Sequence, residues 1–305
     1  MNAIEINNLT KDFGHGRGIF NVNFAVKKGE VFGFLGPNGA GKTTTIRHLM
    51  GFTQPDQGSS KILGLDASKN YAKIMENIGY LPGEINLPEG LTGWQFIRMM
   101  QKMRKSENDD YLNYLLKRFE LDPEGSTKKM SLGNKRKLAI VTAFMNDPEV
   151  LILDEPTSGL DPVMQEQFVQ YMIEEKKRGK TILLSSHIFP EIEATCDRIA
   201  IIKDGRLISE IDASTLKNED EKKYALQVSS KTELNLLKKQ LHSINIQFNP
   251  VGMGLEISTR KEKLNELFSE LSQFKITKFK EIHFNLEEYF LDFYRSDKLF
   301  KGLEK

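Results

Sequence analysis

A glycine-rich stretch at residues 36–44 has the clearest chemical pattern in the chain. Two glycines enclose four residues and are followed by lysine and threonine. The stretch reads Gly36, Pro37, Asn38, Gly39, Ala40, Gly41, Lys42, Thr43 and Thr44. The apolar run Val31–Leu35 predicts a buried strand before it, and apolar residues at helical spacing predict a helix after it. A glycine-rich loop between a strand and a helix N-terminus presents several backbone N–H groups to one anion, so the stretch predicts a phosphate-binding loop.

The residues that close this loop predict what the anion is. Lys42 could reach the terminal phosphates of a nucleotide as a point charge, and the Thr43 hydroxyl could hold the Mg²⁺ that accompanies it. The alternative is a glycine-rich turn that only begins a helix. The strand and helix on either side favour the phosphate loop, which predicts binding of a nucleoside triphosphate.

Two further groups follow apolar runs that predict buried parallel strands. Asp154 and Glu155 come directly after Val150–Leu153, and His187 follows Thr181–Ser185. An Asp at the end of such a strand holds Mg²⁺ in phosphate-loop enzymes, and an adjoining Glu could take a proton from attacking water. The alternatives are an acidic turn and a structural histidine. Sites form at the C-terminal ends of parallel strands, which favours the catalytic interpretation.

Composition narrows the class of protein. The 305 residues carry 43 Lys and Arg against 42 Asp and Glu, so the net charge of +1 is unlike that of a nucleic-acid binder. No apolar run approaches the roughly 18–20 residues of a membrane-spanning helix, and the N-terminus lacks a basic-then-apolar leader, so we expect a cytosolic chain. Cys196 is the only cysteine and is interpreted as an ordinary residue.

The chain divides by pattern into several regions. Residues 84–143 predict helices, and the apolar stretch Trp94–Met103 within them is either core or a docking groove for a partner. The polar residues 213–222 predict a linker. Residues 223–305 predict the order βαββαβ, which is typical of a small ferredoxin-like α+β module, followed by a last short helix. We expect this module to serve dimerisation or packing rather than ligand sensing.

Taken together, residues 1–212 resemble the ATP-binding cassette (ABC) ATPases, and in particular the single-cassette subunits of bacterial ABC-2-type exporters, including bacitracin-type resistance pumps. Residues 36–43 resemble the Walker A motif, and 150–155 resemble Walker B with Glu155 as the catalytic base. Ser158-Gly159-Leu160-Asp161 resembles the D-loop, which makes Asp161 a site candidate. His187 resembles the switch histidine, and Phe13 matches the aromatic residue that stacks on adenine.

Two motifs depart from the family pattern. The signature, Leu-Ser-Gly-Gly-Gln in the family, reads Met130-Ser131-Leu132-Gly133-Asn134. Ser131 and Gly133 remain to face a γ-phosphate, but Leu132 replaces a glycine. After Ile78–Pro82 the family has a glutamine, whereas Gly83-Glu84 stands here. Gly83 has no side chain to reach Mg²⁺ or water, so the alternatives are that Glu84 substitutes for the glutamine or that water is the ligand.

The resemblance implies an α/β P-loop NTPase fold with a helical subdomain, and ATP and Mg²⁺ as ligands. It implies that two cassettes meet head to tail, each phosphate loop facing Ser131 and Gly133 of the other, as a homodimer or with a second ATPase. A separate membrane permease would use the motion, which places the chain at the inner face of the cell membrane. The alternatives are a non-transport ABC ATPase and a regulatory module that binds ATP without turnover. The cargo cannot be read from these residues.

Overall fold

The computed structural model describes residues 1–104, 109–216, 221–282, 286–287 and 289–291. The chain divides into two compact units, Met1–Ala213 and Ser214–Lys305. Each unit has its own apolar core.

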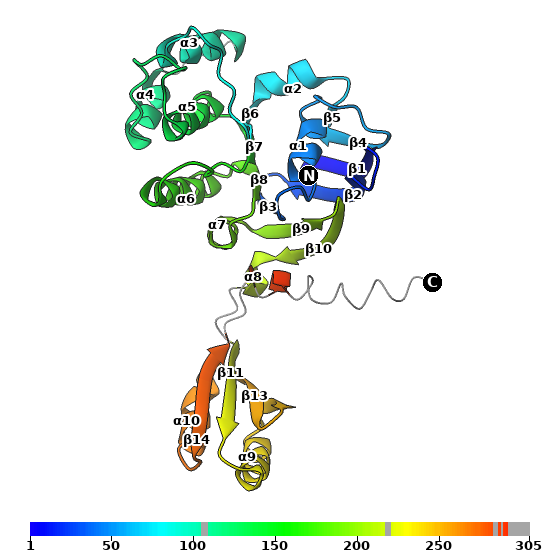
Figure 1. The fold of residues 1–305 in the computed structure, drawn as a ribbon, viewed down its shortest axis with the longest axis vertical. Helices are drawn as coiled ribbons and strands as arrows, with labels where there is room; N and C mark the ends of the chain where they lie inside the picture. Colours follow the sequence, from blue (N-terminus) through cyan, green and yellow to red (C-terminus); the bar gives the residue numbers. More distant parts are fainter. Residues whose placement is uncertain (105–108, 217–220, 283–285, 288, 292–305) are drawn as a thin grey trace. The chain divides into compact units, whose positions relative to one another are not determined.

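A six-stranded sheet forms the centre of the first unit (Figure 1). Its strands lie in the order β10 (Arg206–Asp212), β9 (Arg198–Lys203), β3 (Val31–Leu35), β8 (Thr181–Ser186), β7 (Val150–Asp154) and β6 (Ile78–Leu81). All neighbours are parallel except β10 and β9, the hairpin at Asp204-Gly205. Strands β3, β7 and β8 are buried along their whole length, which explains why they read as continuous apolar runs.

A second, antiparallel sheet packs beside the first in the same unit. Its order is β2 (Gly18–Lys27), β1 (Asn2–Asp12), β4 (Gln57–Ile62) and β5 (Leu65–Asp66). The buried residues of β1 and β2 point into a core that also contains Phe32 and Phe34 of β3, and Phe24 stacks on Phe32 with ring centroids 5.1 Å apart. Strands β4 and β5 are separated by a turn at Leu63-Gly64, where both residues have positive φ and reverse the chain.

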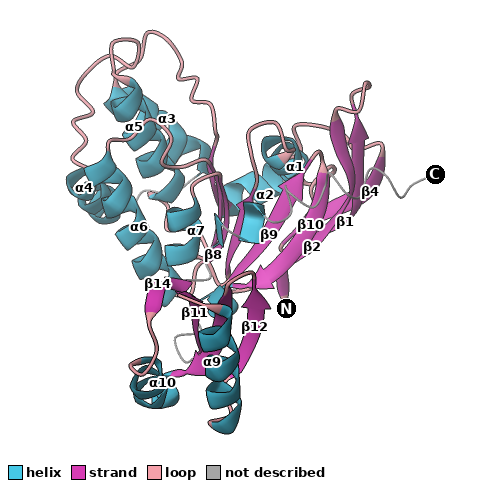
Figure 2. Cartoon of the chain, turned by 60° about the horizontal axis from the view of Figure 1, so that its bottom comes forward, coloured by secondary structure: helices cyan, strands magenta, loops and turns pink. Residues whose placement is uncertain are grey.

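Helices cover the six-stranded sheet and form a separate helical part (Figures 1 and 2). The helices beside the sheet are α1 (Lys42–Leu49), α2 (Tyr71–Asn77), α6 (Pro162–Lys177) and α7 (Phe189–Thr195). The helical part contains α3 (Gly93–Arg104), α4 (Asp109–Arg118) and α5 (Leu132–Phe144). Within α3, Phe96 and Ile97 are buried whereas Met103 is 67% exposed, so one helix carries both a core face and an accessible apolar residue.

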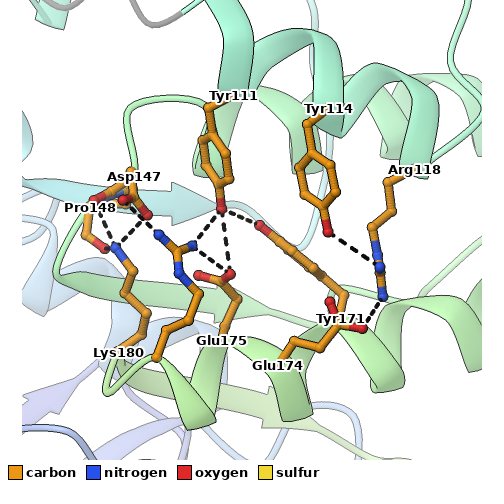
Figure 3. A network of polar contacts seen from close by, with 10 residues as sticks. Tyr111, Tyr114, Arg118, Asp147, Pro148, Tyr171, Glu174, Glu175 and Lys180 are labelled. Atoms are coloured by element: carbon orange, nitrogen blue, oxygen red, sulfur yellow. Dashed lines mark hydrogen bonds and ion pairs between the residues drawn. The ribbon is translucent and has the colours of Figure 1, made fainter.

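A polar network ties the helical part to the rest of the unit (Figure 3). The hydroxyls of Tyr111 on α4 and Tyr171 on α6 lie 2.7 Å apart. Arg178 donates to Tyr111, Glu175 and Asp147, and its pairing with Asp147 extends the network to the turn before β7. Because the buried Tyr171 ring also packs edge-on against neighbouring aromatic rings, we expect α4 and α6 to move together.

The second unit is a four-stranded antiparallel sheet with two helices. Its elements are β11 (Glu221–Val228), α9 (Lys231–Ser243), β12 (Gln247–Val251), β13 (Gly254–Arg260), the short 3₁₀ helix η1 (Lys261–Lys263), α10 (Leu264–Leu271) and β14 (Ile276–Ile282). The spatial order β12-β13-β11-β14 is that of a ferredoxin-like module, so the predicted fold class is confirmed for both parts of the chain. Residues 283–285, which follow β14, lie outside the described part of the chain.

The stretch expected as a linker, 213–222, is more ordered at its ends than its polar composition indicated. A short helix, α8 (Ala213–Leu216), begins it, and β11 begins at Glu221. The Ala213 side chain is buried and its N–H donates to the carbonyl of Asp197, so the chain stays attached to the first unit past residue 212. Residues 217–220 lie outside the described part.

Candidate functional site

The glycine-rich loop connects β3 directly to α1, as its sequence predicted. Gly36 lies so close to β9 that a Cβ there would be 2.4 Å from the Ile202 carbonyl oxygen. Gly41 has φ 111° and closes the loop at the start of α1. No side chain among the described residues caps α1, and its first turn contains no acidic residue, so the N–H groups of that turn can bind an anion. These features match an anion-binding helix terminus.

Lys42 is the cation at the centre of the site, with only 5% of its surface exposed. Its ammonium donates to the carbonyl oxygens of Gly36 at 2.6 Å and Pro37 at 3.2 Å. The same nitrogen lies 3.0 Å from Glu155 Oε1. The loop therefore holds the ammonium beside its own backbone amides, where it adds a full positive charge to the anion site.

Asp154, at the end of β7, is fully buried beside this lysine. Its Oδ1 accepts a very short hydrogen bond from the Ser185 hydroxyl of β8. Its Oδ2 is buried without a hydrogen-bond partner among the described residues. Burial raises the pKa of Asp154, which the hydroxyls of Ser185 and Thr43 offset in part.

This arrangement fits a magnesium ion. Mg²⁺ prefers hard oxygen ligands and is typically held by one or two protein groups together with substrate phosphates. The Thr43 hydroxyl and the unpaired Asp154 Oδ2 supply such oxygens at the mouth of the phosphate loop. A nearby cation would also favour the ionised form of this buried carboxyl group.

Glu155 and His187 complete a row of polar groups across three strand ends. The Glu155 backbone has φ 48°, and its N–H donates to the carbonyl of Ser185 at 3.0 Å and lies 3.2 Å from the Ser185 hydroxyl. Its Oε2 lies 2.7 Å from Nδ1 of His187, which is about half exposed. The carboxylate is thus held between the Lys42 ammonium and the His187 ring, with its conformation set by β8.

Four other predicted residues lie at the ends of local elements. The Ser131 hydroxyl caps α5 by accepting from the Asn134 N–H at 3.2 Å, and the Asp161 carboxylate caps α6 by accepting from the Met164 N–H at 3.0 Å. Gly133 lies in the first turn of α5, and Phe13 follows β1 with 57% of its surface exposed. These contacts account for their local geometry and leave their roles toward a nucleotide as predictions.

Leu132, the unusual residue of the signature, lies over the loop after β7. A Cβ at Gly159 would be 3.0 Å from Leu132 Cγ and Cδ2, so the leucine side chain lies directly against this glycine. Leu132 remains 62% exposed. Leu132 therefore makes an apolar contact between the start of α5 and the loop after β7.

Three residues of the site region were not predicted from the sequence. Ser185 bonds both Asp154 and the Glu155 backbone, Arg136 bonds three loop carbonyls, and the buried Glu191 accepts from Ser186 next to His187. Ser185 and Ser186 could have been noticed as polar residues ending an apolar strand. Arg136 and Glu191 lie on helices, where a charged residue gives no sign of burial.

Known proteins with similar sequences and structures agree with this geometry. The family described as ABC transporter matches residues 19–158. The chain is 34% identical over 298 residues to the bacitracin transport ATP-binding protein BcrA of Bacillus licheniformis, covering 94% of this chain and 96% of that one. It is also 34% identical to the uncharacterized ABC transporter ATP-binding protein YhcH of Bacillus subtilis, covering 95% of each.

A solved structure described as the ATP binding subunit of an ABC transporter is 30% identical to the chain and superposes with a TM-score of 0.65. It covers 71% of this chain and 92% of its own length. Family, relatives and phosphate-loop geometry agree, and the chain therefore belongs to the ATP-binding subunits of ABC transporters, a family of ATPases.

Proposed function

We propose that this chain binds Mg²⁺ and ATP at residues 36–44 and hydrolyses ATP with Glu155 as general base, between two cassettes that power export through a separate membrane permease. The observation that carries the proposal is the row Lys42, Glu155 and His187, in which one carboxylate contacts a buried ammonium at 3.0 Å and an imidazole at 2.7 Å. The carboxylate proposed as the base is thereby within hydrogen-bonding reach of both its orienting partner and a phosphate-binding cation.

Each side chain then has a defined task. The loop amides and Lys42 bind the β- and γ-phosphates, while Thr43 and Asp154 hold the metal ion. When bound, Mg²⁺ neutralises charge that develops on the phosphate oxygens. Glu155 accepts a proton from the attacking water, and His187 keeps the carboxylate oriented. Because phosphate oxygens would compete with Glu155 for the Lys42 ammonium, nucleotide binding would release Oε1 of Glu155 to act as the base.

The signature supports a contact with a second cassette. Ser131 and Gly133 begin α5, Ser131 is exposed, and Gly133 leaves a bare backbone position beside it. A hydroxyl and a backbone N–H at a helix N-terminus suit a γ-phosphate supplied by another chain. Asp161 and Phe13 are proposed to contact the partner cassette and adenine, respectively, because both are exposed at the ends of their elements.

The transport partner is proposed from the relatives. One relative is named for bacitracin transport, and another, from Burkholderia lata and 35% identical over 212 residues, for Nod factor export. No helix in the described part of the chain is long and apolar enough to cross a bilayer. We infer that a separate permease forms the channel and that the chain lies in the cytoplasm at the inner face of the membrane.

The test of the catalytic proposal is Glu155→Gln. The amide keeps the shape of the side chain but is not a base, so we expect intact ATP binding and hydrolysis slowed by about 10²–10⁴-fold. An ATP-bound dimer should then accumulate on size exclusion with Mg²⁺ and ATP. The matched control is Glu166→Gln on the exposed face of α6. Normal turnover in the Glu155 variant would mean that another group is the base.

The permease proposal has its own test at Met103 of α3. Met103→Glu places a charge at an exposed apolar position without disturbing the buried Phe96 and Ile97. We expect folding and isolated ATPase activity to be retained, and co-purification with the membrane permease to be lost. A variant that still co-purifies would exclude this end of α3 as the docking surface.

A further inference from the structure

Arg136 is a buried cation whose hydrogen bonds go to backbone carbonyls of two different loops. It lies in the second turn of α5 with 3% of its surface exposed. Its Nη2 donates to Gly83 O at 2.7 Å and its Nη1 to Pro82 O at 3.0 Å. Its Nε donates to Ser158 O at 2.9 Å. One guanidinium therefore joins the signature helix, the loop after β6 and the loop after β7.

The geometry of the guanidinium makes this linkage specific to arginine. Its planar fork presents N–H donors in several fixed directions, whereas a lysine ammonium is a single centre. Burial lowers the pKa of Arg136, and the nearby carboxylates of Asp154 and Glu155 act in the opposite direction. Burying a charge costs free energy unless the charge is well hydrogen-bonded. A buried arginine at position 136 therefore favours a role beyond filling space.

The loop that Arg136 holds lies directly against the proposed metal ligand. A Cβ at Gly83 would be 3.0 Å from Asp154 Oδ2 and 3.3 Å from Asp154 Cγ. This is the position where the family has glutamine, and here the backbone itself occupies the space beside the carboxylate. Oδ2 is the oxygen without a hydrogen-bond partner among the described residues. The orientation of the Asp154 carboxylate therefore depends on the position of the Gly83 backbone.

We propose that Arg136 is a positioning residue for the ATPase reaction, which holds the Gly83 backbone against Asp154 and so links the metal carboxylate to the signature helix and the D-loop. The proposal rests on the proposed role of Asp154 as a magnesium ligand. In this proposal, the Gly83 backbone and the Arg136 guanidinium that holds it take over the function of the glutamine that this chain lacks. Movement of α5 would then shift the Gly83 backbone and with it the position of the Asp154 carboxylate.

The first test removes the clamp with Arg136→Gln, and Lys135→Gln on the same helix is the control for lost charge. In the protein without nucleotide, hydrogen–deuterium exchange of the peptide covering residues 78–90 should become faster in the Arg136 variant only. The Mg²⁺ concentration that half-saturates ATP hydrolysis should rise by about 10–100-fold, as for other residues that orient metal ligands. The KM for ATP at saturating Mg²⁺ should change little, because the phosphate loop is untouched.

A double-mutant cycle tests whether Arg136 acts on Asp154 through Gly83. Gly83→Ala forces Asp154 or the loop to shift, so it should raise the Mg²⁺ requirement by itself. If Arg136 acts through Gly83, adding Arg136→Gln to Gly83→Ala should have little further effect. Fully additive effects would overturn the proposal. A lower melting temperature with unchanged exchange and unchanged Mg²⁺ requirement would also overturn it, since Arg136 would then be structural only.

Asp154→Asn separates this proposal from the one on which it rests. If that variant needs far more Mg²⁺ while Arg136→Gln does not, only the positioning role fails. If Asp154→Asn keeps the normal Mg²⁺ requirement, the metal assignment fails and the positioning role fails with it. Where Arg136→Gln does not fold, Arg136→Lys replaces it in every comparison, because lysine keeps the charge but cannot bond all three carbonyls.

Discussion

Glu191 provides a test of the electrostatics around His187. This residue of α7 is 3% exposed, and its Oε2 accepts from the Ser186 hydroxyl at 2.5 Å. The same hydroxyl accepts from the Ile188 N–H at 3.0 Å, so the two bonds flank His187. Burial raises the pKa of Glu191 from 4.5 to about 7, and hydrogen bonds from Ser186 and Thr157 offset only part of the effect.

The protonation of Glu191 sets the sign and size of the pH dependence of the free energy of unfolding. The folded chain holds a proton on Glu191 that the unfolded chain has lost, so the free energy of unfolding falls as pH rises from about 4.5 to about 7. At about 1.4 kcal/mol for each pKa unit, this group removes about 2–3 kcal/mol between pH 5 and pH 8. For a unit of this size that corresponds to about 5–10 °C in Tm.

Glu191→Gln should abolish this contribution, because glutamine can accept the Ser186 hydrogen bond but does not ionise. We expect the Tm of the variant, relative to the wild type, to rise between pH 5 and pH 8 by about the 5–10 °C derived above. Calorimetry of the full chain at several pH values measures it, and Glu166→Gln at an exposed position is the control. The same difference in Tm between variant and wild type at every pH would refute the reasoning.

Three further predictions concern the phosphate loop and its surroundings. Lys42→Ala should abolish productive ATP binding, because it removes the buried ammonium of the loop; unchanged turnover would contradict the phosphate-loop assignment. Phe13→Ala should raise the KM for ATP with little change in kcat, since it removes one stacking contact worth about 1–3 kcal/mol; an unaltered KM would exclude that role. Gly41→Ala should weaken nucleotide binding and lower Tm, because its Cβ would lie 2.8 Å from Ile19 in a left-handed backbone, and normal values for both would argue against that strain.

Much of the fold could be predicted because its signals are local. The buried strand β3 was predicted with its observed bounds, since residues covered on both faces form one apolar run. The module of the second unit was predicted from the order of its periodic segments. Residues 213–222 were expected to form a linker from their polar composition. That composition gave no sign that Ala213 is buried and that its N–H donates to the carbonyl of Asp197, because both depend on a part of the chain distant in sequence.

The sequence by itself determined the phosphate loop, the Asp154-Glu155 pair and His187, because each motif lies within a few residues and its spacing sets its local geometry. Only the tertiary structure decided how the groups meet. Strand order brings the ends of β3, β7 and β8 together, which sets Glu155 between Lys42 and His187. It also places Arg136 against carbonyls far away in sequence. Such contacts depend on which surfaces pack together, and no local pattern of residues encodes them.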